Sequence, residues 1–95
     1  MGVDRKVKLL PRAVKELEAL PSPIQNQIIN KLELLGEFPF MGPAMFDAFE
    51  GYRALLVAKN RYRVIYRIVS DDTIEIAYIR RCSRQTYLRA IRTKE

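Results

Sequence analysis

The spacing of hydrophobic residues predicts a short strand followed by a helix at the start of the chain. Residues 3–9 alternate apolar and polar side chains imperfectly, which is typical of a short strand. Residues 12–20 then carry apolar residues at three-residue intervals, as one stripe of a helix does. These residues are Val14, Leu17 and Leu20. Pro11 suits the first turn, where its missing backbone N–H is not needed.

A second helix is predicted over residues 22–35. Ser22 is a suitable N-cap, and Pro23 suits the first helical position. The apolar face of this helix consists of Ile24, Ile28, Leu32 and Leu35. Gly36 is expected to end the helix, because glycine is common just past a helix C-terminus. The two helices therefore form a hairpin whose apolar stripes need a sheet to cover.

Alternation with period two predicts three consecutive strands in the second half of the chain. The strands cover residues 52–59, 62–70 and 74–81, with turns at 59–61 and 71–73. Residues 38–51 form an irregular connector, which we expect to pack as a flap at the sheet edge. Ser83 can cap a short last helix that runs to about Arg92. The expected fold is α+β: an N-terminal strand, a helical hairpin packed on a twisted antiparallel β-meander, and a short C-terminal helix, all in one domain over residues 1–95.

Strand alternation also predicts which side chains share a face. The core side of the central strand consists of Tyr62, Val64, Tyr66 and Ile68, and the core side of the next strand consists of Ile74, Ile76 and Tyr78. A three-residue loop at 71–73 would pair Ser70 with Ile74 and Tyr66 with Tyr78, and would place Arg63 directly opposite Arg81.

Two arginines in this arrangement suggest a bound anion. Like charges across a strand pair cost about 0.2–1 kcal/mol, and a phosphate held between two guanidiniums would reverse that sign. Arg67 shares this face, and Arg53 joins it if residues 59–61 are also a three-residue loop. The alternative is that Glu75 or Asp47 pairs with one arginine, or that one side chain extends into solvent.

The charge distribution also indicates an anionic partner. Residues 1–50 hold six Lys or Arg and seven Asp or Glu, whereas residues 51–95 hold eleven and four. The excess positive charge of the chain therefore lies in the half that contains the three strands, which is typical of proteins that bind nucleic acid or an acidic segment. A solvated basic face without a partner is the alternative.

The composition excludes several kinds of chemistry. The chain has no histidine and one cysteine, so we expect no zinc site, no histidine-assisted nucleophile and no cofactor. No carboxylate pair suits a two-metal nuclease, so any cleavage must proceed without metal on Arg, Lys and Tyr. Cys82 lies between Arg81 and Arg84, but without a histidine partner a nucleophilic role is disfavoured. The single cysteine and the lack of a membrane span or signal peptide indicate a cytoplasmic protein.

The strand motifs resemble those of the RelE/ParE superfamily of toxin-antitoxin toxins over nearly the whole chain. The resemblance lies in Gly51-Tyr52-Arg53, the segment 62–68, Ile74-Glu75-Ile76, Arg80-Arg81 and Tyr87. It implies one of two activities. RelE-type toxins cleave mRNA in the ribosomal A site through attack of a 2′-hydroxyl on the adjacent phosphate, whereas ParE-type toxins inhibit DNA gyrase and need no catalytic residues.

On the RelE-type interpretation, the resemblance assigns a role to each of three residues. Arg63 would stabilise the charge on the phosphorane, Arg81 would assist the leaving oxygen, and Tyr87 would stack on the base or help to deprotonate the 2′-hydroxyl. Arg53 would replace a family lysine, whereas Leu55 stands where a second basic residue is typical. The residues expected to bind RNA are Arg53, Lys59, Arg61, Arg67, Arg80 and Arg84.

The expected partners follow from the same resemblance. They are the ribosome, mRNA and an acidic antitoxin that folds on binding and could form a hetero-oligomer with the toxin. Three hypotheses stay open at this point: a ribosome-dependent endonuclease, a gyrase inhibitor, and a non-catalytic binding module of the same fold. Tyr87 favours the first hypothesis, and Leu55 motivates the last.

Overall fold

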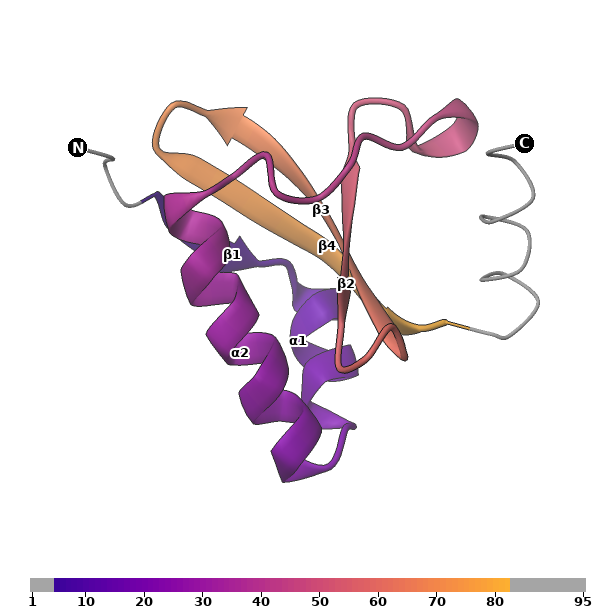
Figure 1. Ribbon diagram of the computed structural model, residues 1–95. Helices are drawn as coiled ribbons and strands as arrows, with labels where there is room; N and C mark the ends of the chain where they lie inside the picture. The colour runs from indigo at the N-terminus through magenta and orange to yellow at the C-terminus, as the bar shows by residue number, and fades with distance from the viewer. Residues whose placement is uncertain (1–4, 83–95) are drawn as a thin grey trace.

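The computed structural model describes residues 5–82 and contains one mixed four-stranded sheet with two α-helices and one short 3₁₀ helix (Figure 1). The strands are β1 (Lys6–Leu9), β2 (Arg53–Val57), β3 (Tyr62–Ser70) and β4 (Thr73–Arg81). The helices are α1 (Pro11–Glu18), α2 (Ser22–Glu37) and the short 3₁₀ helix η1 (Asp47–Phe49). This order confirms the predicted α+β fold, and the predicted last helix lies outside the described residues.

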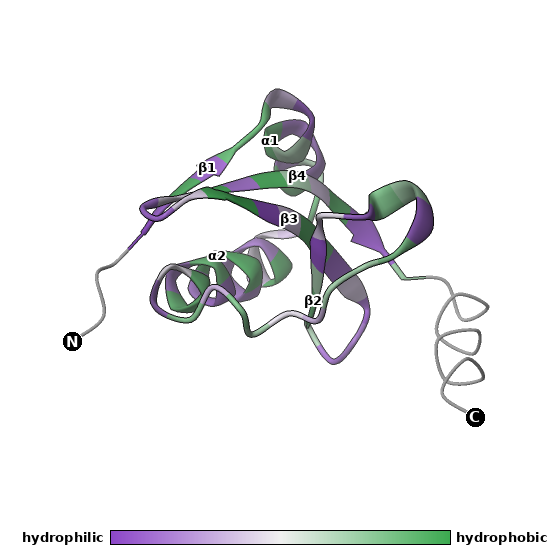
Figure 2. Ribbon diagram, turned by 90° about the horizontal axis from the view of Figure 1, so that it is seen from above, coloured by the Kyte–Doolittle hydropathy of each residue, from purple (hydrophilic) through white to green (hydrophobic). Residues whose placement is uncertain are grey.

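The strand order is β1-β4-β3-β2, which makes β1 an edge strand. It pairs in parallel with the first half of β4, whereas the other two pairings are antiparallel. The sheet is therefore mixed, and β1 ends at Leu9 opposite Ile76, halfway along β4. Beyond that point α1 lies beside β4, while α2 crosses one face of the sheet (Figures 1 and 2).

The apolar stripe predicted for α2 faces the sheet. Ile28 and Leu35 are fully buried, Leu32 is nearly so, and Ile24 packs at the margin. The sheet contributes to this core Leu55, Val57, Val64, Tyr66, Ile74, Ile76 and Ile79. Within residues 5–82, neither helix is both long and apolar enough to cross a membrane.

Two predicted details of the helices are wrong. Gly36 does not end α2 but lies buried inside it. Glycine fits there because the chain just before β1 passes close by, and a Cβ would lie 3.1 Å from the Arg5 carbonyl oxygen. Val14 is 36% exposed, and Ala13 is fully buried in its place. Residues at i, i+4 and i+7 stay on one side of a helix, so Ala13 aligns with Leu17 and Leu20 better than Val14 does.

Helix α2 begins without the cap that was expected. Its N-cap residue is Pro21 and carries no side-chain hydrogen bond, while Ser22 is already helical. The position is instead fixed by backbone contacts, because the N–H groups of Ile24 and Gln25 both donate to the Pro21 carbonyl oxygen at 3.0 Å.

The connector after α2 follows the outer edge of β2, as predicted. The Ala54 N–H donates to the Pro43 carbonyl oxygen at 3.0 Å. The buried Tyr66 hydroxyl donates to the Pro39 carbonyl oxygen at 2.7 Å and accepts the Gly42 N–H at 3.1 Å. Gly42 fits there because a Cβ would lie 2.7 Å from the Ala54 carbonyl oxygen. This hydroxyl therefore joins the connector to the centre of the sheet.

The pairing of β3 with β4 differs from the predicted register. The turn is Asp71-Asp72, two residues rather than three, since Ser70 pairs with Thr73 instead of Ile74. Val69 and Ala77 have no partner in the register, so each acts as a bulge that shifts the pairing by one residue.

The shorter turn and the Val69 bulge together shift the pairing by two residues from the prediction, and the Ala77 bulge brings it back to a shift of one residue. Tyr66 pairs with Ile76 and not with Tyr78, and Arg63 pairs with Arg80 and not with Arg81. Ile79 is buried in the core, which leaves Tyr78 on the opposite face. The predicted pairings of Tyr66 and Arg63, and the core position of Tyr78, are therefore wrong.

Candidate anion-binding site

Arg63 and Arg80 lie side by side on the face of the sheet that points away from α2. Their strand neighbours, Val64 and Ile79, pair with each other and are buried in the core, so the two arginines must face the other way. Within residues 5–82 no hydrogen bond or ion pair joins Arg63 to another side chain. A cross-strand pair of arginines is thus present, with Arg80 in the place predicted for Arg81.

Arg80 is held by two neighbours. Its guanidinium carbon lies 4.4 Å from the centroid of the Tyr78 ring, and its Nε lies 3.8 Å from Glu16 Oε2. The other carboxylate oxygen of Glu16 accepts the Ile79 N–H at 2.8 Å. Because β1 has already ended, this N–H has no strand to donate to, and α1 supplies the acceptor. No local pattern points to Glu16, since the contact spans 63 residues.

Arg81 pairs with Tyr62, on the side of the sheet that carries the core. It is exposed, because the core ends before this position. Tyr87 and Arg84 lie outside the described residues. The catalytic set expected from the resemblance is therefore represented in the structure by Arg63 and Arg81, on opposite faces of the sheet.

Arg53 does not join the arginine pair. The turn between β2 and β3 has four residues, 58–61, rather than three, so Arg53 pairs with Tyr66 on the core face. Its Nε donates to the Gly42 carbonyl oxygen at 2.6 Å, and its guanidinium lies 5.1 Å from the Phe40 ring centroid. Arg53 thus stabilises the connector.

Two leucines of β2 occupy positions that matter for the site. Leu55 is buried in the core, so no side chain at that position reaches the arginine pair. Leu56 is the cross-strand partner of Arg63 and is 44% exposed. The surface beside Arg63 is therefore apolar on the β2 side.

Arg67 already has a partner. Its Nη2 lies 3.2 Å from Glu75 Oε1, and its guanidinium lies 5.6 Å from the Tyr52 ring centroid. This is the alternative that the sequence left open, in which Glu75 neutralises one of the arginines.

Lys59 and Arg61 are exposed in the turn between β2 and β3. This turn lies next to the end of β4, because the Cys82 N–H donates to the Arg61 carbonyl oxygen at 2.7 Å. Basic side chains therefore gather at one end of the sheet, where the hydrophilic tip of β4 is visible in Figure 2. We call this region the basic end; it consists of Lys59, Arg61, Arg63, Arg80 and Arg81.

Cys82 is half-buried beside the basic end. Burial raises the pKa of its thiol, and the positive charge of Arg63 offsets only part of that effect. The thiol is therefore a poor nucleophile near neutral pH, which agrees with the disfavoured role of Cys82.

A small aromatic cluster covers the sheet face next to the arginine pair. The Phe49 ring makes edge-to-face contacts with Tyr52 and Tyr78, with centroids 6.1 and 6.0 Å apart. The guanidinium carbon of Arg12, from α1, lies 5.5 Å from the Tyr78 centroid. Arg12 was not predicted as a site residue, because nothing in the sequence places α1 beside the end of β4.

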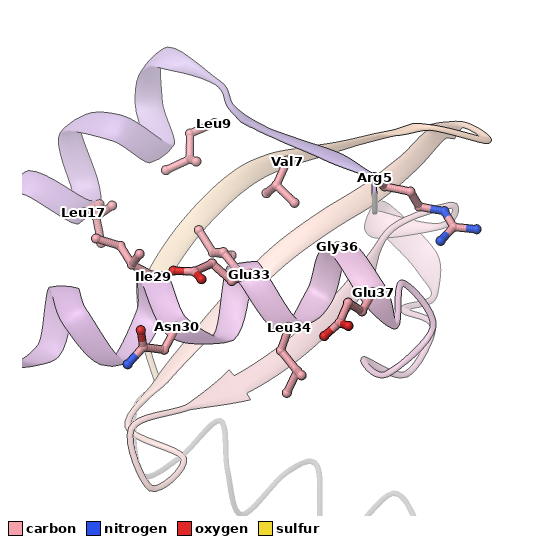
Figure 3. A pocket seen from close by; sticks show the side chains of 11 residues that line it. Arg5, Val7, Leu9, Leu17, Ile29, Asn30, Glu33, Leu34, Gly36 and Glu37 are labelled. Carbon is pink, nitrogen blue, oxygen red and sulfur yellow. The ribbon is translucent and has the colours of Figure 1, made fainter. Parts of the chain in front are cut away.

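One groove lies away from the arginine pair, between β1 and α2 (Figure 3). It has a volume of about 840 Å³, and its apolar walls include Val7, Leu9 and Ile29. Glu33 and Glu37 add acidic groups to its lining. This groove does not suit the phosphate expected at the arginines.

Comparison with known proteins identifies the kind of molecule to which this site belongs. A family model described as the ParE toxin of the type II toxin-antitoxin system, parDE, matches residues 7–86. No curated protein sequence matches the chain.

Solved structures of toxins share the fold. The isolated RelE toxin of E. coli is 18% identical, with a TM-score of 0.71 over 96% of this chain and 99% of that one. In the toxin-antitoxin complex RelBE2 from Mycobacterium tuberculosis, the matching chain is 21% identical, with a TM-score of 0.70 over 84% of this chain and 100% of that one. In the chromosomal ParDE system of P. aeruginosa, the matching chain is 18% identical, with a TM-score of 0.68 over 84% of this chain and 98% of that one. Both RelE and ParE proteins therefore share the fold of this chain.

Proposed function

We propose that this chain, which belongs to the ParE toxin family of type II toxin-antitoxin systems, cleaves ribosome-bound mRNA without a metal ion. The observation that carries the proposal is the pairing of Arg63 with Arg80 on an exposed sheet face. Neighbouring guanidiniums there repel each other, and a phosphate between them would bring opposite charge and matching acceptor oxygens.

The proposed chemistry is an internal transfer at one phosphate of the mRNA. The 2′-oxygen bonds to the adjacent phosphorus, the bond from phosphorus to the 5′-oxygen breaks, and the products carry a cyclic phosphate and a 5′-hydroxyl. Arg63 and Arg80 would stabilise the extra negative charge on the phosphorane, in fixed positions and with no reorganisation.

Arginine cannot accept the proton of the 2′-hydroxyl, so this proton needs another acceptor. Tyr87 is the proposed one, because nearby positive charge lowers the pKa of a phenol. The leaving 5′-oxygen gains its proton from solvent. Its developing negative charge would be stabilised by a hydrogen bond from Arg80 if the shared face decides, or from Arg81 if position along the chain decides.

The test is to induce the wild type and single variants and to map new 5′-hydroxyl ends on mRNA. Arg63→Gln and Arg80→Gln should each lower cleavage by about 10²-fold or more, as expected for the loss of a preorganised donor. Arg81→Gln should have a smaller effect if Arg80 serves the leaving oxygen. Lys8→Gln, on β1, is the control with the same change of charge. Intact mRNA during wild-type growth arrest would reject the proposal.

The second candidate function is inhibition of DNA gyrase by binding alone. Two observations favour it. Leu56, directly across from Arg63, has an exposed apolar side chain that a protein partner could cover. The matching family model is described as the ParE toxin. On this alternative, the purified protein blocks supercoiling by gyrase, induction triggers the DNA damage response, and mRNA stays intact.

We also propose that an acidic antitoxin covers the basic end and folds as it binds. Solved relatives occur in toxin-antitoxin complexes, and the positive charge of the second half of this chain suits such a partner. If an acidic protein is encoded beside this chain, its co-expression should relieve growth arrest and yield a hetero-oligomer. Free toxin after co-expression would count against this pairing.

A further inference from the structure

We propose that Arg12 and Tyr78 form a second binding position for single-stranded RNA, which takes the phosphate of a nucleotide flanking the one held by Arg63 and Arg80. The inference rests on the proposed function and adds a residue from α1 to a site otherwise built on strands. It assigns a part of the substrate to a surface outside the arginine pair.

The geometry brings three arginines into one row. Arg80 and Arg12 approach the same Tyr78 ring, at 4.4 and 5.5 Å from its centroid. Their guanidinium carbons are therefore no more than about 10 Å apart. Arg63 follows as the cross-strand partner of Arg80. The row is thus Arg12, Arg80 and Arg63, with Arg12 exposed at one end.

The charges in this row are not balanced by the protein. Glu16 is the one carboxylate among the described residues that pairs with any of the three, at 3.8 Å from Arg80. Glu75 is engaged by Arg67. Three guanidiniums against one carboxylate leave an excess of positive charge that folding does not need, and an additional anion beside Arg12 would offset it.

The residue types match a strand-binding surface better than a simple anion site. Proteins that bind single-stranded nucleic acid combine guanidiniums, which follow the backbone, with aromatic rings on which bases stack. Tyr78 is half-buried and makes an edge-to-face contact with Phe49, 6.0 Å away between centroids, so its ring is held in place. A strand whose scissile phosphate lies at Arg63 and Arg80 would therefore continue over Tyr78 toward Arg12.

The contact between Arg12 and Tyr78 also has a purely structural explanation. An exposed cation-π contact stabilises a fold by about 0.5–1 kcal/mol, and Arg12 could serve only that purpose. Thermal stability alone does not separate the two explanations. The salt dependence of RNA binding does, because each phosphate contact to a single strand contributes about 0.7 to the slope of log K against log salt concentration.

The experiment measures binding of a fluorescein-labelled single-stranded RNA of about 12 nucleotides to the full-length protein, without ribosomes. Fluorescence anisotropy is recorded between about 50 and 200 mM salt. Arg12→Gln should lower the slope by about 0.7 and weaken binding at low salt. Lys15→Gln removes the same charge from the same helix, one turn away, and should leave the slope unchanged.

The outcomes separate this inference from the proposed function. A lower melting temperature for Arg12→Gln with an unchanged slope would overturn the inference, since Arg12 would then act in packing alone. If Arg63→Gln and Arg80→Gln lower the slope while Arg12→Gln does not, the phosphate site stands and the second position fails. If Arg12→Gln alone lowers the slope, the second position stands and the arginine pair is not the phosphate site.

Discussion

Glu16 closes the edge of β4 where no strand is available to do so. Its Oε1 accepts the part-buried Ile79 N–H at 2.8 Å. Glu16→Ala leaves that donor without a partner, and we expect the free energy of unfolding in urea to fall by about 1–3 kcal/mol. Glu16→Gln keeps an acceptor oxygen, so its free energy of unfolding should fall clearly less. Glu18→Ala, on the exposed side of the same helix, is the control, and equal losses for all three variants would contradict this role.

Cys82 reports on the position of Arg63. Burial disfavours the thiolate and raises the pKa of the thiol, while Arg63 opposes that shift. The rate of alkylation by iodoacetamide follows the thiolate fraction, so its midpoint should lie at higher pH in the folded protein than in urea. Arg63→Gln should move the folded midpoint higher still. If Arg63→Gln leaves the folded midpoint unchanged, Arg63 lies farther from Cys82 than it does in the structure.

These residue contacts explain why the candidate site could be predicted only in part. Alternation along β3 correctly placed Arg63 on the exposed face, because alternation is a local property of a strand. Glu16 contacts β4 only through the placement of α1, and Arg53 depends on a turn that is one residue longer than expected. Neither the tertiary placement of a helix nor the length of a turn is encoded in strand alternation.

The connector between α2 and β2 depends on one buried hydroxyl. Tyr66→Phe removes the group that bridges the Pro39 carbonyl oxygen and the Gly42 N–H, and leaves both unpaired in a buried place. We expect the free energy of unfolding to fall by about 1–3 kcal/mol and hydrogen exchange at the Gly42 N–H to become faster. Tyr62→Phe is the matched control, because the Tyr62 hydroxyl has no hydrogen bond within residues 5–82. Equal effects of the two substitutions would argue against the bridge.

It was easier to predict which helices and strands form than to predict how neighbouring strands pair. The α2 stripe and the three later strands follow from periodicity, because burial of one face fixes the pattern of apolar residues. The register between β3 and β4 depends on Val69 and Ala77, two bulges that shift the pairing in opposite directions. The one local sign is the spacing of Ile74, Ile76 and Ile79, in which the last interval is three rather than two. A bulge before Ile79 keeps all three isoleucines in the core, and this moves Arg80 opposite Arg63.

At the scale of the whole molecule, five basic side chains of the described residues 5–82 gather at one end of the sheet. Lys59 and Arg61 belong to the basic end, whereas Lys6 and Lys8 lie on β1, beside the start of β4. Charges that act together attract a polyanion more strongly than the same charges spread apart, since screening limits each charge to about 8–10 Å at physiological salt.

Retention on immobilised heparin tests this arrangement. The double variant Lys59→Gln/Arg61→Gln should elute at clearly lower salt than the wild type, because it removes two members of one cluster. Lys6→Gln/Lys8→Gln removes the same total charge from the other end and should shift elution much less. Equal shifts for the two pairs would mean that only net charge matters, and the basic end would then have no special role in attracting RNA or an acidic antitoxin.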